Sequence, residues 1–168
     1  VNTIQSSPVG TYDYRLTTPF RAMGSLAFII GQYGLFSADY EYVNYSQARF
    51  NTTYDNYYGS YSEVNNQIMS DYRSWGNIRL GTEWRLSNFR LRGGFAYFSN
   101  PYQEGMNNSE RYQVSAGFGF RTKHFFTDVT YVWTRMNQDY YLYDPSLVKP
   151  AVITYHTNTV STTVGFRF

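Results

Sequence analysis

The sequence contains no cysteine, and only two of its 14 basic residues, Lys123 and Lys149, are lysines. Without cysteine the chain has no disulfide framework, no thiolate nucleophile and no zinc finger. Charged residues make up 15% of the chain, below the roughly 25% usual in soluble domains. The longest apolar stretch, Leu26–Ile30, is far shorter than the ~20 residues of a spanning helix. The net charge of +2 argues against nucleic acid as a partner, because a phosphate-binding face needs concentrated basic residues.

Aromatic residues are what the chain has in excess, at 21% of its 168 residues, with 19 Tyr and 13 Phe. Disordered chains lack aromatics, so we expect an ordered protein. The length corresponds to one domain covering residues 1–168. Many Tyr, Phe, Asn, Gly, Ser and Thr with little Lys indicate a sheet that has one face in lipid.

Apolar and polar residues alternate with period two in eight segments, the signature of half-exposed strands. The clearest pair is Asn77–Leu86 and Phe89–Tyr97, joined by Ser87 and Asn88. A two-residue turn fixes the register and sets Glu83 opposite Arg92. The other predicted strands are Thr11–Leu16, Phe20–Ile30, Phe36–Tyr42, Tyr112–Phe120, Phe125–Trp133 and Val160–Phe168.

The connections between these strands alternate in length. Short turns are predicted at Gln32–Gly34, Ser87–Asn88 and Arg121–His124, and long loops at Asn44–Gly76, Ser99–Glu110 and Met136–Pro150. Short turns at one end and long loops at the other are typical of transmembrane barrels, whose long loops are extracellular. In the longest loop Tyr61, Val64, Ile68 and Tyr72 lie close to helical spacing, which predicts a short amphipathic helix.

The distribution of charge separates this interpretation from a soluble β-sandwich or β-propeller, whose polar face would carry Lys and Glu. One face of the predicted strands carries nearly all the strand charges, and Arg135, near a strand end, is the exception on the other face. Lipid would enforce this, because an outward Arg at the bilayer midplane costs roughly 2–4 kcal/mol. The inward charges are Asp13, Arg15, Arg21, Asp39, Glu41, Arg79, Glu83, Arg85, Arg90, Arg92, Arg111, Arg121, Asp128 and Arg167. The sequence thus predicts an all-β fold, a transmembrane antiparallel up-and-down β-barrel of about eight strands.

The two ends of the sequence carry different signals. Val164, Phe166 and Phe168 form an alternating C-terminal pattern that periplasmic barrel-assembly machinery reads. We therefore expect the assembly machinery, outer-membrane lipid and lipopolysaccharide as partners, in a bacterial outer membrane with the C-terminus periplasmic. Val1 follows no export signal, so we expect a chain that is processed or cut from a longer protein.

Four segments together resemble a known family. They read YRLTTPFR at 14–21, GLFSADYEY at 34–42, NIRLGTEWR at 77–85 and VGFRF at 164–168. In this order they resemble the FadL/TodX outer-membrane transport family, over nearly the whole chain but only the C-terminal part of the family. The resemblance implies transport of long-chain fatty acids or other hydrophobic compounds. Family members have fourteen strands, an N-terminal plug and a lateral opening, so this chain is either a closed small barrel or the C-terminal part of a fourteen-stranded one. The plug and about six strands are absent, so we expect transport to need the missing strands or a partner.

Candidate ligand sites lie in the long loop and on the inward face. The loop aromatic and apolar residues predict a capture surface for hydrophobic small molecules, with self-packing at the rim as the alternative; they are Phe50, Tyr54, Tyr57, Tyr58, Tyr61, Val64 and Ile68. The inward charges predict an ion network, with recognition of a carboxylate head group as the alternative; they are Asp39, Glu41, Arg79, Glu83, Arg85, Arg90, Arg92, Arg111 and Asp128.

Catalytic chemistry has little to build on, because His124 and His156 are the only histidines. A membrane-embedded lipid hydrolase would use His156 with inward Ser or Thr neighbours, and we expect instead that the protein is not an enzyme. The spacing of loop Asp and Asn residues matches no metal loop, so we expect neither a metal nor another cofactor. The main alternative to a transporter is a non-transporting barrel that acts as a surface anchor, adhesin or secretion component.

Overall fold

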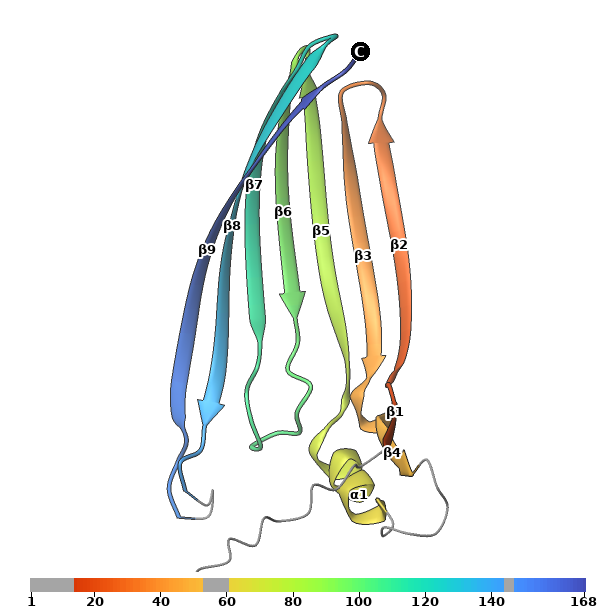
Figure 1. Cartoon of the computed structure of the whole chain (residues 1–168), viewed down its shortest axis with the longest axis vertical. Helices are drawn as coiled ribbons and strands as arrows, with labels where there is room; N and C mark the ends of the chain where they lie inside the picture. The colour runs from red at the N-terminus through yellow and green to blue at the C-terminus, as the bar shows by residue number, and fades with distance from the viewer. Residues whose placement is uncertain (1–13, 53–60, 144–146) are drawn as a thin grey trace, which may run out of the picture.

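The structure, a computed structural model, describes residues 14–52, 61–143 and 147–168. These residues form one seven-stranded antiparallel sheet and one two-stranded sheet. In the large sheet each strand pairs with its neighbours along the chain, so the sheet is a meander (Figure 1). Its strands are β2 (Phe20–Ile30), β3 (Gly34–Asn44), β5 (Ser74–Leu86), β6 (Phe89–Phe98), β7 (Arg111–Arg121), β8 (Phe125–Tyr140) and β9 (Ala151–Phe166).

The seven strands predicted for this sheet are confirmed in order and direction. Glu83 pairs with Arg92, as the two-residue turn predicts. In that turn Ser87 has φ +54°, a left-handed conformation that residues other than Gly, Asn and Asp rarely adopt. The loop 99–110 also has the predicted limits, because β6 ends at Phe98 and β7 begins at Arg111.

The prediction of a closed eight-stranded barrel is wrong for the described part of the chain. There β2 pairs only with β3 and β9 only with β8, so the sheet has two free edges. The expected first strand does not extend this sheet: β1 (Tyr14–Thr17) pairs with β4 (Arg49–Thr52) in the two-stranded sheet. Thr18 and Pro19 separate β1 from β2, and proline lacks the N–H that a continuous ladder needs.

The last hairpin is longer than predicted. β8 continues to Tyr140 and β9 begins at Ala151, so residues 136–140 and 151–159 are strand, although 136–140 was predicted as loop and 151–159 was assigned to no strand. At its other end β9 stops at Phe166, before Arg167 and Phe168.

The longest loop contains the predicted helix. η1 (Tyr45–Gln47) follows β3, and α1 (Ser62–Asp71) precedes β5, at the end of the sheet opposite the C-terminus (Figure 1). Neither of the two helices in the described ranges has the length and apolar character needed to cross a bilayer.

The buried side chains of the sheet lie on its polar face, near its loop end. Val43 is the one apolar residue among those described that is buried, at 1% exposure, and it lies beside the polar Glu41 (5%) and Asn77 (6%). The opposite face carries large apolar side chains that are exposed, such as Leu26, Phe28 and Val160, each at 66–68%. This arrangement inverts that of a water-soluble domain, where apolar side chains are buried and charges are exposed.

Candidate functional site

The nine predicted lumen charges all lie on the polar face of the large sheet. The register shows this, because Asp39 pairs with Arg79, Glu83 with Arg92, and Arg85 with Arg90. Asp128 and Arg111 follow on the same face through the β7–β8 and β6–β7 pairings. A strand alternates its side chains between two faces, so regular pairing brings distant charges into one field.

Glu41 is the centre of the ionic contacts in the loop half of this face. Its Oε1 lies 3.2 Å from Arg21 Nε, and its Oε2 accepts from Arg79 Nη2 at 3.0 Å. Asn77 Nδ2 donates to the same Oε2 at 3.2 Å, and Asn77 Oδ1 accepts from the backbone N–H of Ser99 at 3.2 Å. One buried carboxylate thereby ties β2, β3 and β5 to the start of the 99–110 loop.

A second group of ion pairs occupies the turn half. Arg92 bridges two carboxylates, donating at 2.7 Å to Glu83 and at 2.7 Å to Asp128. Arg85 lies 2.9 Å from Glu83, and Arg121 lies 3.4 Å from Asp128. Each carboxylate therefore binds two arginines. Arg90, by contrast, directs Nη1 to backbone carbonyls of its own turn.

Phe98 contacts two arginines in the loop half of this face, level with Glu41 and Asn77. The Arg111 guanidinium lies 3.9 Å from the centre of the Phe98 ring and that of Arg79 lies 5.3 Å from it, both within cation–π range. The Arg111 Nε is buried and has no hydrogen-bond partner among the described residues.

At the loop end, α1 packs against the two-stranded sheet through aromatic rings. The Phe50 ring lies 5.7 Å from the ring of Tyr14 and 5.8 Å from that of Tyr61. The Asn65 side chain accepts from the Phe50 N–H at 2.8 Å and donates to the Phe50 carbonyl at 2.9 Å. Asn65 thus satisfies both backbone groups of Phe50, as a neighbouring strand would. Sequence reasoning missed this contact, because an Asn in a polar loop carries no signal of it.

Only part of the predicted capture surface falls within the described residues. Phe50, Tyr61 and Ile68 are partly buried at the base of α1, whereas Val64 is exposed on its outer side. Tyr54, Tyr57 and Tyr58 lie outside the described residues. The structure thus brings Phe50 and Tyr61 together and leaves the Val64 side chain exposed.

The 99–110 loop is joined to the end of α1 by two tyrosines. The rings of Tyr72 and Tyr102 lie 4.9 Å apart, and their backbones form an isolated antiparallel bridge. Burial is the largest cause that raises the pKa of Tyr72, with contributions from the Tyr102 hydroxyl and the charge of Asp71. The phenol therefore stays neutral beyond its ordinary range, and the loop is held against the helix.

Two hollows lie back to back at mid-height of the sheet. The one on the apolar face, of about 400 Å³, is framed by Phe28, Phe36 and Phe95. The one on the polar face, of about 390 Å³, is lined by small residues and by the Glu83–Arg92 pair. Gly81, Thr82, Gly93 and Gly94 line both, so the wall there is only a backbone thick.

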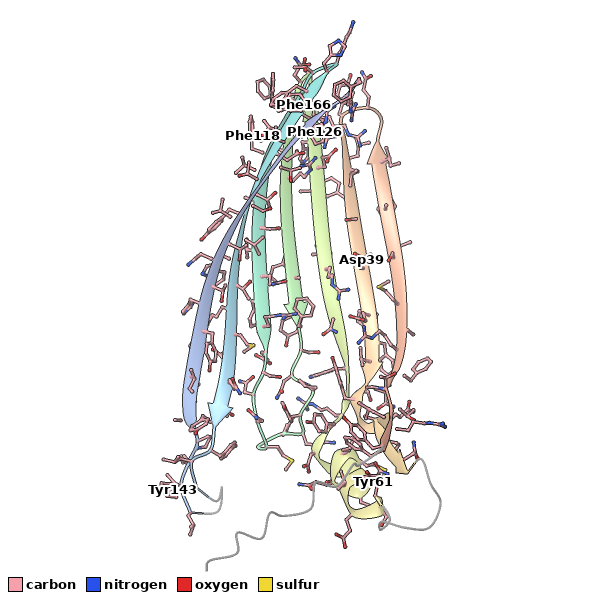
Figure 2. All side chains as sticks on the ribbon, in the orientation of Figure 1. Asp39, Tyr61, Phe118, Phe126, Tyr143 and Phe166 are labelled. Atoms are coloured by element: carbon pink, nitrogen blue, oxygen red, sulfur yellow. The ribbon has the colours of Figure 1, made fainter. Side chains whose placement is uncertain are left out.

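A third hollow, of about 240 Å³, lies at the tip of the β8–β9 hairpin between Tyr140, Tyr143 and Val148. Figure 2 shows Tyr143 and Tyr61 at this end of the molecule, with Phe118, Phe126 and Phe166 at the other. Hollows with apolar linings thus lie at the loop end of the molecule as well as on the sheet.

The histidines lie apart from the inward Ser and Thr side chains. His156 pairs with Arg135 and stacks on the Trp133 ring at 5.9 Å, on the apolar face of β8 and β9. His124 lies in the short β7–β8 turn, residues 122–124. The hydrolase geometry would need His156 beside inward Ser or Thr side chains, which point to the opposite face. Among the described residues no three His, Asp or Glu side chains gather as metal ligands.

Val164 and Phe166 lie on the apolar face of β9, where the Phe166 ring contacts that of Phe125 at 5.6 Å. Phe168 lies beyond the strand and is fully exposed. No protein-family model, curated protein or solved structure matches this chain.

Proposed function

We propose that the seven-stranded sheet is part of the wall of a bacterial outer-membrane β-barrel that takes up hydrophobic compounds, such as long-chain fatty acids. One observation carries the membrane part of this proposal. The apolar face is exposed across all seven strands, while on the other face the Glu41 carboxylate is buried and those of Glu83 and Asp128 are mostly covered, and lipid stabilises that pattern whereas water does not.

The dimensions of the apolar face support this placement. On β6 it runs from Phe89 to Tyr97, eight residues apart, which corresponds to about 27 Å of strand. With the strand tilt of barrels this length fits an apolar band about 25 Å tall. Phe89 packs on Phe120 at the turn end, and Tyr97 packs on Tyr112 at the loop end. Aromatic rows at both ends match the girdles of membrane barrels.

The loop end supports the uptake part of the proposal. The exposed Val64 and Met69 side chains of α1 and the Tyr143 hollow present apolar surface where extracellular ligands arrive. The polar face behind them carries small residues at mid-height, which leave room along the inner wall. The ordered set of segments that resembles the FadL/TodX family points to the same class of ligand.

The uptake proposal is tested by lauric acid binding to protein purified from outer membranes. Val64→Asp should weaken binding about tenfold, because it places a charge on the exposed apolar surface of α1. The packing of Phe50 on Tyr61 does not involve Val64 and should stay intact. Glu63→Gln, one residue earlier and also exposed, is the matched control and should bind as the unaltered chain does. Membrane insertion without any lauric acid binding would refute uptake and favour a surface anchor, adhesin or secretion component.

A further inference from the structure

The large sheet ends in two free edges, and both are long. β2 has 11 residues and β9 has 16, and in the described part of the chain each pairs on one side only. Their apolar side chains are exposed, with Phe28 on β2 and Val160 on β9 each at 68%. In lipid every unpaired backbone N–H or C=O costs several kcal/mol, so open edges do not persist there. We therefore expect further strands to pair with the free edges of β2 and β9 in the membrane.

The direction of the two edges limits what this can be. Six antiparallel pairings separate β2 from β9, so the two strands run in the same direction (Figure 1). Pairing β2 with β9 directly would make a parallel seam in an otherwise antiparallel wall. An antiparallel seam at both edges requires an odd number of strands between them.

A second copy of the same sheet does not meet this requirement. Two copies in one membrane have their loops on the same side, so β9 of one copy runs parallel to both β2 and β9 of the other. An antiparallel seam between copies would turn one of them upside down, with its loops in the periplasm. The missing strands therefore differ from the seven described.

The charges of the polar face indicate what these strands carry. In the turn half the described residues include five arginines, Arg85, Arg90, Arg92, Arg121 and Arg167, against the two carboxylates Glu83 and Asp128. Both carboxylates already bind two arginines each. Arg85 and Arg90 are directly opposite one another, and like charges in that position repel. Carboxylates from the facing wall would compensate this excess of positive charge.

We propose that the sheet is completed by an odd number of further amphipathic strands, antiparallel to β2 and β9, that place Asp or Glu side chains against Arg85 and Arg90. The inference rests on the proposed membrane location, because only lipid forbids the open edges. These strands present apolar residues outward, continuing the band of Phe28 and Val160, and polar residues inward.

Solid-state NMR on the isotope-labelled protein in its own outer membranes tests the pairing. We expect slow amide exchange along the free sides of β2 and β9 and antiparallel cross-strand contacts at both edges. Parallel contacts between β2 and β9, or freely exchanging edge amides, would overturn the inference. The chain has no cysteine, so introduced cysteines report without background. A disulfide between Ser25→Cys and Ser161→Cys in one chain would establish direct closure, and a Ser161→Cys dimer would establish a second copy.

The same isotope-labelled protein tests whether the further strands place carboxylates against Arg85 and Arg90. The Arg90 guanidinium should contact a carboxylate carbon that belongs to neither Glu83 nor Asp128, and Arg90→Gln should abolish that contact. Arg79→Gln is the control, because Arg79 already pairs with Glu41 at 3.0 Å, and it should leave the contact unchanged. A contact from Arg90 to phosphorus, or no anion contact at all, would refute the acidic strands.

The failure of this inference is distinguishable from failure of the membrane location. Contacts between lipid acyl chains and Leu91 on the apolar face report on the membrane location alone. Acyl contacts together with a parallel seam would contradict only the inference that an odd number of strands completes the sheet. Absence of acyl contacts would refute the proposal that the sheet lies in the membrane.

Discussion

The sharpest test of the lipid-facing sheet compares two adjacent residues of β7. Val114 lies on the apolar face between Phe95 and Trp133 and is 47% exposed in the isolated sheet. Gln113 lies on the polar face, where its Nε2 donates to Thr134 Oγ1 at 3.2 Å. Val114→Arg and Gln113→Arg therefore place the same charge at the same height on opposite faces of one strand.

The expected cost follows from what Val114 faces. An Arg facing lipid costs roughly 2–4 kcal/mol at the midplane, and less toward the interfaces. Val114 lies two residues along β7 from Ala116, which is level with the middle of the apolar band. We therefore expect Val114→Arg to cost about 2 kcal/mol, or about thirtyfold in the folding equilibrium. In water the same substitution at a half-exposed position would cost no more than about 0.5 kcal/mol.

The assay is reversible unfolding in urea of protein refolded into lipid vesicles, followed by the fluorescence of its three tryptophans. Gln113→Arg is expected to cost about 0.5 kcal/mol, mostly through its lost hydrogen bond to Thr134. Equal costs for the two variants, or a greater cost for Gln113→Arg, would refute the assignment of the apolar face to lipid.

Three further predictions concern stability. Glu41→Gln should destabilise the sheet by about 2 kcal/mol in the same urea assay, because Arg21 and Arg79 lose their shared carboxylate, whereas Asp39→Asn, which breaks no ion pair in the described ranges, should cost little. Ser87→Gly should stabilise the β5–β6 turn by about 1 kcal/mol, since glycine adopts φ +54° without strain, and an unchanged urea midpoint would contradict this. Because the pKa of Tyr72 is raised above 10.0, its neutral form contributes stability that is complete below that pH and is lost as the pH rises through the raised value; tyrosinate absorbance and loop proteolysis should rise together, and Tyr72→Phe should delay the proteolysis.

The strands and their faces were predictable because two independent signals agree. Alternation assigns each residue to a face, and short turns set the register, so Glu83 opposite Arg92 follows from Ser87 and Asn88 alone. The same signals place Asp39 and Arg79 on one face but do not say which carboxylate each arginine binds. Glu41 rather than Asp39 binds Arg79, a choice that depends on rotamers and on Asn77.

The failures have a common physical cause. Alternation reports the contrast between two environments, and it fades where both faces of a strand are polar. β8 runs through Asn137, Gln138 and Asp139 with its hydrogen-bond ladder intact, so that part of the strand was read as loop. The pairing of β1 with β4 was missed for a different reason. β4 has four residues, too few to show a period, and its pairing with β1 depends on distant contacts such as that of Phe50 with Tyr14.

The length of the last hairpin explains the two charges, Arg135 and Asp139, that lie on the outward face of β8. β8 and β9 each have 16 residues, about 53 Å of strand, which exceeds the apolar band even when the strands tilt. In the proposed orientation the excess projects on the loop side, where lipid head groups and lipopolysaccharide replace acyl chains. Arg135 pairs with His156 and is level with Tyr112 and Tyr97, the aromatic pair at the loop end of the band, and Asp139 lies four residues farther toward the loops. An arginine at this height meets anionic head groups instead of hydrocarbon, so Arg135 is consistent with the rule that excludes charge from the band.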